Sequence, residues 1–378
     1  MKICIDARWI FPELSGIGLY TQELIHALAA VDRENDYTLL FDNLEIQNRV
    51  RLATRFDLSQ RFRAIRVPYG LFSLRNQWKL PSLLKKEGFD LYHSTNYMMP
   101  LWGTGSVRRA VTIHDLIPLL FPDHAPRSKK TRLFPIYKRL MLEVAARADL
   151  IIAPSGSTRR DIIRELNIPP PREERVVSIP EGVSPKYQPG PPPAGRAEKI
   201  ILYVGRSDPY KNLPRLVEAL AGVRANGVNA RLRVVGSPDP RYPAAPRRAA
   251  ELNMTPFVDW TGYVSDEQLV REYQSADVFC LPSRYEGFGL TLLEAMACGI
   301  PSVCSNIGSL PEVAGDAARK IDPAILPQLV TALTEVLTRA DIAEDLGRRG
   351  HQRAAQFTWE RTARQTIEAY RQTLARPA

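Results

Sequence analysis

Short apolar runs alternate with helical patterns along this chain of 378 residues, and this alternation limits its fold more than any other feature. In the first half, strand-like runs lie at residues 2–5, 37–41, 64–67, 91–93, 109–113, 150–153 and 175–179. In the second half, they lie at residues 200–204, 230–235, 258–260, 278–281 and 302–305. Strands that alternate with helices build parallel sheets that helices cover. We therefore predict an α/β protein with two doubly wound, parallel-sheet (Rossmann-like) domains.

A proline-rich stretch separates the two series. Residues 180–199 contain six prolines and three glycines, which suit neither a helix nor a central strand. We predict an interdomain linker here, with one domain over residues 1–184, a second over 185–358 and a long final helix within 359–378. Ligands of open parallel sheets bind beyond the carboxyl ends of the strands, so we expect the functional site in a cleft between the two domains.

The overall composition argues against several protein classes. No run of about 18 apolar residues is present, so no membrane span is predicted. Residues 1–6 enter a strand pattern at once, which is unlike a signal peptide. The four cysteines have no metal-ligand spacing, and reduced, buried thiols are expected; they are Cys4, Cys280, Cys298 and Cys304. Reduced thiols are typical of the cytoplasm, which is the predicted location.

The chain is basic, with a formal net charge of +10, and one segment concentrates that charge. Its six basic residues are Arg127, Lys129, Lys130, Arg132, Lys138 and Arg139, with no acid between them. Two interpretations stay open: a solvated surface, or contact with an anionic membrane or a lipid-linked acceptor at the inner face of the membrane. No helix-turn-helix, zinc finger or aromatic RNA-binding set accompanies the charge, so no nucleic-acid partner is expected.

The segment 283–299 carries the clearest functional signal. Gly287 and Gly289 free the backbone to bend and to approach a ligand. The apolar run that follows from Leu290 predicts a buried helix, whose first turn offers N–H groups to an anion. Glu294 lies inside this helix, where a carboxylate suits hydroxyl groups rather than the anion. A phosphate in front and hydroxyls beside it indicate a nucleotide or a sugar nucleotide.

Two cations follow the first strand of the second half. Arg206 lies at the carboxyl end of that strand, and Lys211 lies near the start of the next helix. Two cations at such a place suit a diphosphate, although surface cations on a loop are the plainer alternative. No Asp-x-Asp motif occurs, so we expect neither a bound metal nor another cofactor.

The first half offers two weaker candidates. Gly16 and Gly18 precede the first helical pattern, where a helix N-terminus suits an anion or a close ligand. His114 and Asp115 follow a strand and precede a proline, so they either line a site or merely fix the turn. Residues 93–96 also end a strand and are expected to line the cleft.

Together these motifs resemble the retaining glycosyltransferases of family 4, which have the GT-B fold. Glu286 and Glu294 match the family's Glu-x7-Glu motif in its Glu-Gly-Phe-Gly-Leu setting, and Gly205-Arg206 with Lys211 matches its phosphate-binding pair. Residues 15–18 match its N-terminal glycine loop, with serine where glycine is common, and residues 114–116 look like its histidine variant. The likeness covers essentially the whole chain and implies that the last helix crosses back to the first domain.

The resemblance also implies residue roles. Arg206 and Lys211 would neutralise the departing diphosphate, Glu286 would bind the donor sugar, and His114 would contact that sugar near the anomeric carbon. Other contacts to the donor would come from the ribose-binding Glu294, from Gly16 and Gly18, and from Gly205, Tyr263, Val264, Gly287, Phe288, Gly289, Leu290 and Thr291.

The function that the resemblance implies is that of a retaining hexosyltransferase. It would move a sugar from a nucleoside diphosphate, with GDP-mannose favoured, to a glycan or lipid-linked acceptor hydroxyl in polysaccharide, lipopolysaccharide or glycolipid assembly. The acceptor would attack from the face that the diphosphate leaves, without a protein nucleophile and without a metal. The alternatives are a transferase that uses a UDP-sugar, a sugar-nucleotide epimerase or phosphorylase, and a basic binding protein without activity.

Overall fold

The chain forms two compact units. The computed structural model describes residues 1–13, 15–122, 134–191, 196–237 and 239–377. Unit 1 comprises residues 1–116, 133–182 and 358–378, and unit 2 comprises residues 117–132 and 183–357. The chain thus leaves unit 1 at Gly182, inside the proline-rich stretch, and returns to it at Thr358. The sequence-based range 1–184 includes the described residues 117–122, which group with unit 2.

Unit 1 is built on a parallel sheet whose seven strands have the order β3-β2-β1-β4-β5-β6-β7. The strands are β1 (Lys2–Asp6), β2 (Asp36–Phe41), β3 (Phe62–Arg66), β4 (Leu91–Ser94), β5 (Arg108–Thr112), β6 (Leu150–Ala153) and β7 (Val176–Ser178). The order turns back on itself between β1 and β4, which is the topological switch point of a doubly wound sheet. Side chains after β1, β4 and β5 therefore gather at one edge.

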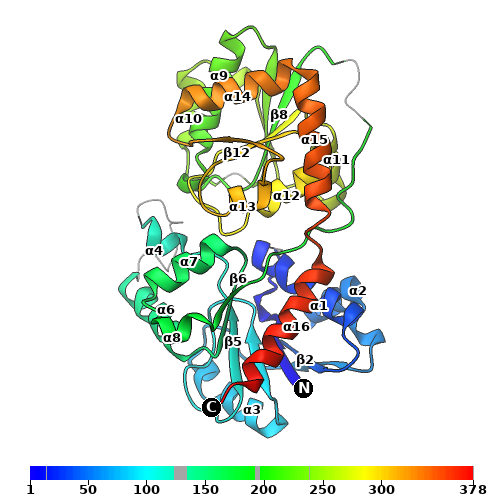
Figure 1. Ribbon diagram of the computed structural model, residues 1–378, viewed down its shortest axis with the longest axis vertical. Coiled ribbons are helices and arrows are strands. Elements are labelled where there is room, and N and C mark those ends of the chain that lie inside the picture. Colours follow the sequence, from blue (N-terminus) through cyan, green and yellow to red (C-terminus); the bar gives the residue numbers. More distant parts are fainter. Residues whose placement is uncertain (14, 123–133, 192–195, 238, 378) are drawn as a thin grey trace. The chain divides into compact units, whose positions relative to one another are not determined.

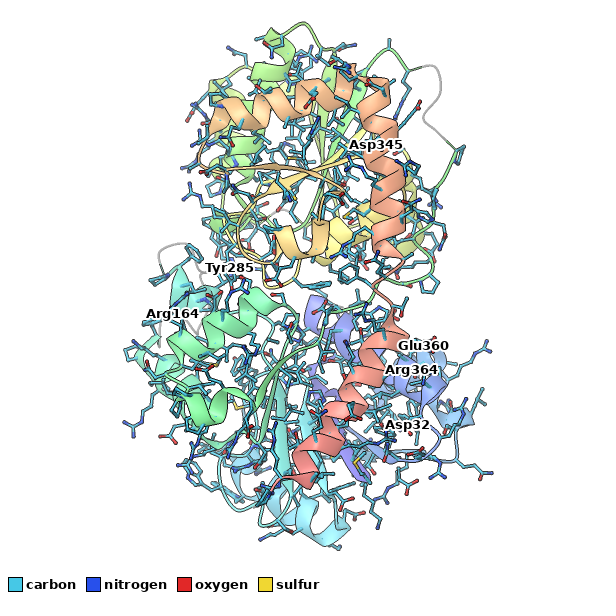
Figure 2. All side chains as sticks on the ribbon, in the orientation of Figure 1. Asp32, Arg164, Tyr285, Asp345, Glu360 and Arg364 are labelled. Carbon is cyan, nitrogen blue, oxygen red and sulfur yellow. The ribbon has the colours of Figure 1, made fainter. Side chains whose placement is uncertain are left out.

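Helices complete unit 1 (Figure 1). They are α1 (Gly16–Val31), α2 (Leu44–Thr54), α3 (Lys79–Glu87), α6 (Phe134–Arg147), α7 (Gly156–Glu165), α8 (Pro170–Glu173) and α16 (Trp359–Ala375). The last helix packs against α1, because Ala363 and Tyr370 of α16 enter the same hydrophobic core as Leu24 and Leu28 of α1. On the outer side of α16, Glu360 accepts a hydrogen bond of 2.8 Å from Arg364 (Figure 2).

Unit 2 repeats this plan with a six-stranded parallel sheet in the order β10-β9-β8-β11-β12-β13. The strands are β8 (Lys199–Val204), β9 (Ala230–Val235), β10 (Val258–Gly262), β11 (Val278–Leu281), β12 (Ser302–Ser305) and β13 (Arg319–Ile321). Its helices are α4 (Ile117–Leu120), α9 (Leu213–Ala225), α10 (Ala244–Glu251), α11 (Asp266–Gln274), α12 (Leu290–Ala297), α13 (Leu310–Ala314), α14 (Leu326–Thr338) and α15 (Ala340–Ala354). Helix α9 packs against both α10 and α14, and α12 packs against α13 and α15. The switch point of this sheet lies between β8 and β11.

The predicted pair of doubly wound, parallel-sheet domains is confirmed. All four cysteines are buried and free of disulfides, as predicted. Within the described residues, no helix is both long and apolar enough to cross a membrane.

Candidate active site

A cluster of polar side chains in unit 2 lies at the carboxyl ends of β8 and β11. These two strands are neighbours in the sheet, with Val278 opposite Ile201. The segment after β8 carries Arg206 and Lys211, and the segment after β11 carries Glu286 and the turn into α12. Because both segments leave the sheet at its switch point, residues about 80 positions apart in the sequence come together.

Lys211 and Glu286 form a close ion pair. The Lys211 ammonium donates to both carboxylate oxygens of Glu286 at 2.8 Å. The Ser283 hydroxyl donates to Glu286 Oε1 at 2.6 Å, so the carboxylate is oriented from two sides. The side chains of Lys211 and Glu286 are only 16% and 10% exposed, and such a pair loses much of its screening by water. This contact joins two residues that sequence analysis assigned to one site, and adds Ser283.

Arg206 is held by a carboxylate that sequence analysis did not single out. Its Nε donates to Asp208 Oδ2 at 2.7 Å, and the Asp208 side chain is fully buried while the Arg206 side chain is 61% exposed. Burial alone would lower the pKa of Arg206, but the charge of Asp208 and the hydrogen bond outweigh it and raise that pKa. The guanidinium is therefore anchored at one edge, while its other face stays open to a ligand.

The turn before α12 presents backbone N–H groups rather than side chains. Gly289 has φ of +102°, and no side chain caps the helix that starts at Leu290. A Cβ atom on Gly289 would lie 2.5 Å from a methyl carbon of Leu310, so a glycine is required here. The Ser309 hydroxyl hydrogen-bonds the carbonyls of Glu286 (2.9 Å) and Phe288 (2.7 Å) and fixes the turn. An uncapped helix start of this kind favours an anion.

Glu294 lies one turn further along α12 and is almost completely buried. It accepts a hydrogen bond of 2.8 Å from the Tyr273 hydroxyl, and the Tyr187 ring packs edge-on against the Tyr273 ring at 5.7 Å. Burial raises the pKa of Glu294 to about 7, and its interactions with Tyr273 and Tyr187 offset part of that rise. Neither tyrosine was identified from the sequence, because both come from distant segments. The hydroxyl donor of Tyr273 on this carboxylate shows that it can accept from hydroxyl groups.

The other donor-side candidates have mixed environments. Tyr263 is 81% exposed and follows Gly262 at the end of β10, so its ring is available to a flat ligand. Phe288 instead enters the hydrophobic core, where its ring lies 6.0 Å from that of Phe357. The Phe288 side chain is therefore structural, and only its backbone faces the turn. Gly205, Gly287, Thr291 and Val264 lie in or beside the segments described above.

In unit 1, His114 follows β5 and lies in a defined network. Its two ring nitrogens lie 3.2 Å from Glu181 Oε1 and 3.0 Å from the Thr95 carbonyl oxygen. The Tyr20 ring packs edge-on at 4.7 Å. Burial alone would lower the pKa of His114, but the hydrogen bond and charge of Glu181 outweigh it and raise that pKa. An imidazolium can donate to both acceptors, so the network favours the protonated ring.

The glycine loop differs from the expectation. Gly16 is the first residue of α1, and Gly18 lies within its first turn, so both belong to the helix rather than to a loop before it. Ser15 caps the helix by accepting a hydrogen bond of 3.2 Å from the Gly18 amide. Space around Gly16 is open, since a Cβ there would meet nothing within 4 Å. A ligand can therefore approach this helix start closely.

Two further groups of unit 1 that the sequence singled out differ in their exposure to solvent. His93 does not line a cleft: it is completely buried and hydrogen-bonds Tyr370 (2.6 Å) and Thr112 (2.9 Å), so it ties α16 to the sheet. Of the basic segment, Lys138 and Arg139 are exposed on α6, whereas Arg127, Lys129, Lys130 and Arg132 lie outside the described residues. In the part of the chain that is described, no three His, Cys, Asp or Glu side chains cluster as metal ligands would.

Comparison with known proteins gives consistent matches over both units. Residues 14–187 match the family model "Glycosyltransferase Family 4", and residues 190–353 match "Glycosyl transferases group 1". O-antigen chain mannosyltransferase B of Escherichia coli is 31% identical, with 98% of this chain and 100% of that protein covered. MMP alpha-(1->4)-mannosyltransferase of Mycolicibacterium hassiacum is 33% identical over 64% of this chain and 58% of its own length.

Solved structures show the same fold. Sucrose-phosphate synthase from Thermosynechococcus elongatus has a TM-score of 0.75 at 24% identity and covers 99% of both chains. HepE from Anabaena, solved in complex with UDP and glucose, has a TM-score of 0.75 at 18% identity and covers 98% of this chain and 100% of its own.

Proposed function

Since the chain belongs to the glycosyltransferase family that these matches define, we propose that it transfers mannose from GDP-mannose to a hydroxyl of a growing glycan or lipid-linked acceptor, with retention of configuration. One observation carries the donor side of this proposal. At the switch point of unit 2, two cations, an uncapped helix start and a carboxylate that binds hydroxyls lie on adjacent segments. The full-length similarity to a mannosyltransferase favours mannose.

The proposed roles of these residues follow from the charges of their side chains and of the donor. A diphosphate needs cations and N–H donors, which Arg206, Lys211 and the turn before Leu290 supply. As the bond to the sugar breaks, negative charge grows on the diphosphate, and these groups stabilise it. The sugar hydroxyls would replace Lys211 as partners of Glu286, and the ribose hydroxyls would join the Tyr273 hydroxyl at Glu294.

The remaining residues complete the proposed donor site. Gly205, Gly287 and Gly289 let the backbone approach the phosphates, Leu290 and Thr291 offer their amides, and Tyr263 and Val264 border the base. We assign His114, Gly16 and Gly18 of unit 1 to the sugar and the diphosphate, as the family resemblance implies. The raised pKa of His114 favours an imidazolium, and because its two N–H groups are directed at Glu181 and the Thr95 carbonyl, it would act on the substrate through its positive charge.

The proposed reaction requires no metal, because fixed cations balance the diphosphate. We also propose a cytoplasmic location with peripheral contact at an anionic membrane. The exposed Lys138 and Arg139 of α6 would contact its headgroups. Vesicle flotation of the wild type and a Lys138→Ser/Arg139→Ser variant tests this contact. Equal flotation of both proteins would contradict it.

A donor screen tests the central proposal. Release of nucleoside diphosphate is measured with GDP-mannose and with UDP-sugars, and thermal stabilisation by GDP is compared with that by UDP. GDP-mannose is expected to be turned over only when an acceptor is present. Selective use of a UDP-sugar would refute the donor assignment, and conversion of the donor without acceptor would indicate an epimerase. Absence of any shift with nucleoside diphosphates would refute the site itself.

A pair of variants tests whether the cluster at the switch point of unit 2 is the donor site. Glu286→Ala should abolish turnover, whereas Glu344→Ala, on the exposed side of α15, should leave it unchanged. If Glu286→Ala keeps its turnover, the cluster at the switch point is not the donor site.

A further inference from the structure

Four large apolar side chains of unit 1 remain exposed on two segments of the chain. Three of them, Phe72, Leu74 and Trp78, are 61%, 74% and 58% exposed, and Trp102 is 54% exposed. Single exposed apolar side chains are ordinary on protein surfaces, whereas several on adjoining segments indicate a contact with something other than water.

The two segments lie against each other. The Gln77 side chain accepts a hydrogen bond of 2.9 Å from the Leu101 amide. A Cβ atom on Gly103 would lie 3.4 Å from Pro81 in the first turn of α3. Trp102 stands between Leu101 and Gly103, and it therefore lies beside the segment that carries the other three exposed side chains.

The core fixes this segment from within. Leu71, Asn76 and Leu80 alternate with the exposed residues and are buried. The side-chain oxygen of Asn76 accepts a hydrogen bond of 2.9 Å from the buried Arg8 guanidinium. The exposed apolar side chains are therefore presented to solvent by an anchored backbone.

Unpaired positive charge accompanies these apolar side chains. In the part of the chain that is described, no ion pair or side-chain hydrogen bond engages the four exposed cations of the segment, which are Arg75, Lys79, Lys85 and Lys86. The Lys85 side chain reaches the second segment, since a Cβ atom on Gly105 would lie 3.4 Å from its Cδ. No acid occurs at residues 58–86 or 91–114, and Glu87 is paired with Arg63 at 2.8 Å. We call the four apolar side chains and the four cations together the apolar–basic surface.

A second copy of this chain and a nucleic acid both fit this surface poorly. In a twofold contact the same cations would face each other, and like charges oppose such a contact. A nucleic acid would balance the cations, but its phosphates offer no apolar layer to cover Leu74. An anionic bilayer offers an apolar layer and negative headgroups at one boundary, which matches both properties of the surface.

We propose that the apolar–basic surface inserts into the boundary of an anionic membrane, with Phe72 and Leu74 among the acyl chains. The indole rings of Trp78 and Trp102 suit the headgroup level, where tryptophan is enriched. The lysine and arginine side chains bind the lipid phosphates. This insertion goes beyond the contact proposed for α6, which acts through charge alone, and it does not depend on the donor assignment.

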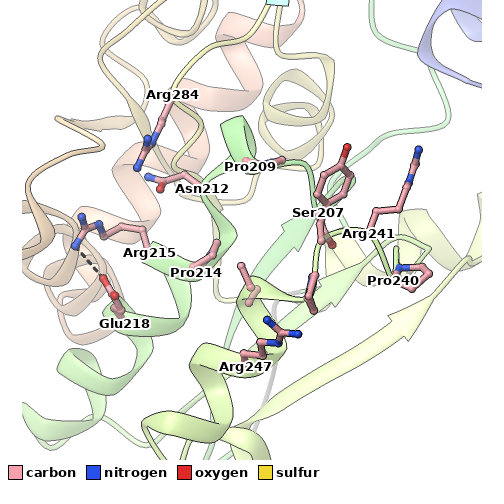
Figure 3. A pocket seen from close by; sticks show the side chains of 14 residues that line it. Ser207, Pro209, Asn212, Pro214, Arg215, Glu218, Pro240, Arg241, Arg247 and Arg284 are labelled. Carbon is pink, nitrogen blue, oxygen red and sulfur yellow. Dashed lines mark hydrogen bonds and ion pairs between the residues drawn. The ribbon is translucent and has the colours of Figure 1, made fainter. Parts of the chain in front are cut away.

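The arginines around the cavity of unit 2 differ from this surface. The cavity opens where α9 and α10 begin and is lined by four arginines (Figure 3), but Arg215 is paired with Glu218 and Arg241 with Asp239. None of the large exposed apolar side chains is among its described lining residues. Arg247→Ser, at an exposed position of this cavity, is therefore a control that removes one positive charge and no exposed apolar side chain.

Flotation with phosphatidylcholine vesicles, with and without phosphatidylglycerol, tests the proposal. The full chain should float with the anionic vesicles. The variant Phe72→Ser/Leu74→Ser/Trp78→Ser should bind them at least roughly tenfold more weakly, because burial of apolar area drives insertion. Leu58→Ser should leave binding unchanged, since Leu58 is 77% exposed but lies outside the surface.

The cations are tested in the same assay. Arg75→Ser/Lys79→Ser should weaken binding to the anionic vesicles roughly tenfold, because each cation near an anionic surface adds to the attraction. Arg247→Ser should leave it nearly unchanged. Melting temperatures equal to that of the wild type show that each variant is folded.

Tryptophan fluorescence separates insertion from contact through charge alone. Brominated lipids quench indole rings that enter the bilayer, so vesicles that contain them should quench the wild type. Trp78→Phe/Trp102→Phe should lose most of this quenching but still float, because phenylalanine keeps an apolar ring. Neither assay contains donor or acceptor, so its outcome is independent of the proposed transfer reaction.

Three results would overturn the proposal. One is equal vesicle binding by the wild type and the triple-serine variant. Another is flotation without quenching by brominated lipids, which would leave a contact through charge alone. The third is a lipid-free dimer of the wild type that the triple-serine variant dissociates in sedimentation, since a second copy would then cover the surface.

Discussion

Burial of the Glu294 carboxylate lowers the stability of the fold at neutral pH, whereas the proposed ligand needs this carboxylate as an acceptor. A single substitution should separate the two effects. Burial raises the pKa of its carboxyl from an ordinary 4.5 to about 7. A carboxyl whose pKa is higher in the folded than in the unfolded state stabilises the fold fully below the unfolded pKa. That contribution is lost as the pH rises through the folded pKa. The rise to about 7 corresponds to about 3 kcal/mol of unfolding free energy, lost between about pH 4.5 and 7.

Glu294→Gln removes this titration while keeping the size of the side chain. Above pH 7 the variant should be more stable than the wild type by up to about 3 kcal/mol. For a domain the size of unit 2 this is a rise in melting temperature of roughly 6–12 °C. Near pH 5 the two proteins should differ little, because the wild-type carboxyl is then protonated. The same variant should bind GDP more weakly, since its neutral amide is a weaker acceptor than the carboxylate for the Tyr273 hydroxyl and the proposed ribose contact.

Differential scanning calorimetry from pH 5 to 8.5 measures the effect, and calorimetric titration with GDP measures affinity. Glu344→Gln, an exposed change in the same unit, is the control and should alter neither quantity. A stability difference between Glu294→Gln and wild type that does not change with pH would refute the reasoning. So would a variant that is less stable at pH 8.5 than at pH 5 relative to wild type.

Three further changes should have separate signatures. Lys211→Ala should lower kcat/KM roughly 10²-fold in the diphosphate-release assay, since it removes a group that stabilises the leaving charge; unchanged kcat/KM would exclude that role. Gly289→Ala should lower the melting temperature more than Gly227→Ala, because both have positive φ but only Gly289 also lacks space for a Cβ; equal losses would contradict the steric argument. Glu181→Gln should shift the NMR titration of His114 to lower pH, because it removes the carboxylate that raises this pKa; an unmoved titration would show that Glu181 does not hold the imidazolium.

The sequence predicted the two sheets well because the run or spacing of apolar residues within each strand and helix reflects which of its residues are buried. The runs at 200–204 and 278–281 correspond to β8 (Lys199–Val204) and β11 (Val278–Leu281). The sequence-based division assigned residues 117–122 to the first domain, because their grouping with unit 2 depends on a tertiary contact. The Phe121 ring, for example, lies 5.7 Å from that of Tyr285. No local pattern encodes such a contact.

The sequence indicated the cations and carboxylates of the candidate site, but not which of them contact each other. A motif shows that a lysine and a glutamate are present at suitable positions, yet only the fold shows that Lys211 and Glu286 are 2.8 Å apart. Tyr187 and Tyr273 lie on segments far from Glu294 in the sequence, and tyrosines are common core residues. Asp208 had a local signal, since it stands two residues after Arg206, but an acid beside a cation is frequent on protein surfaces.

The Lys211–Glu286 pair has a consequence for the proposed recognition of the donor. Separating a nearly buried ion pair leaves two uncompensated charges, which costs roughly 3–5 kcal/mol. A nucleoside diphosphate alone offers phosphate to Lys211 but leaves Glu286 with only Ser283, and a free sugar offers hydroxyls to Glu286 without a charge for Lys211. An intact sugar nucleotide supplies both partners at once. Its affinity should therefore exceed what its two parts predict separately, and a nucleoside diphosphate alone should bind measurably but more weakly.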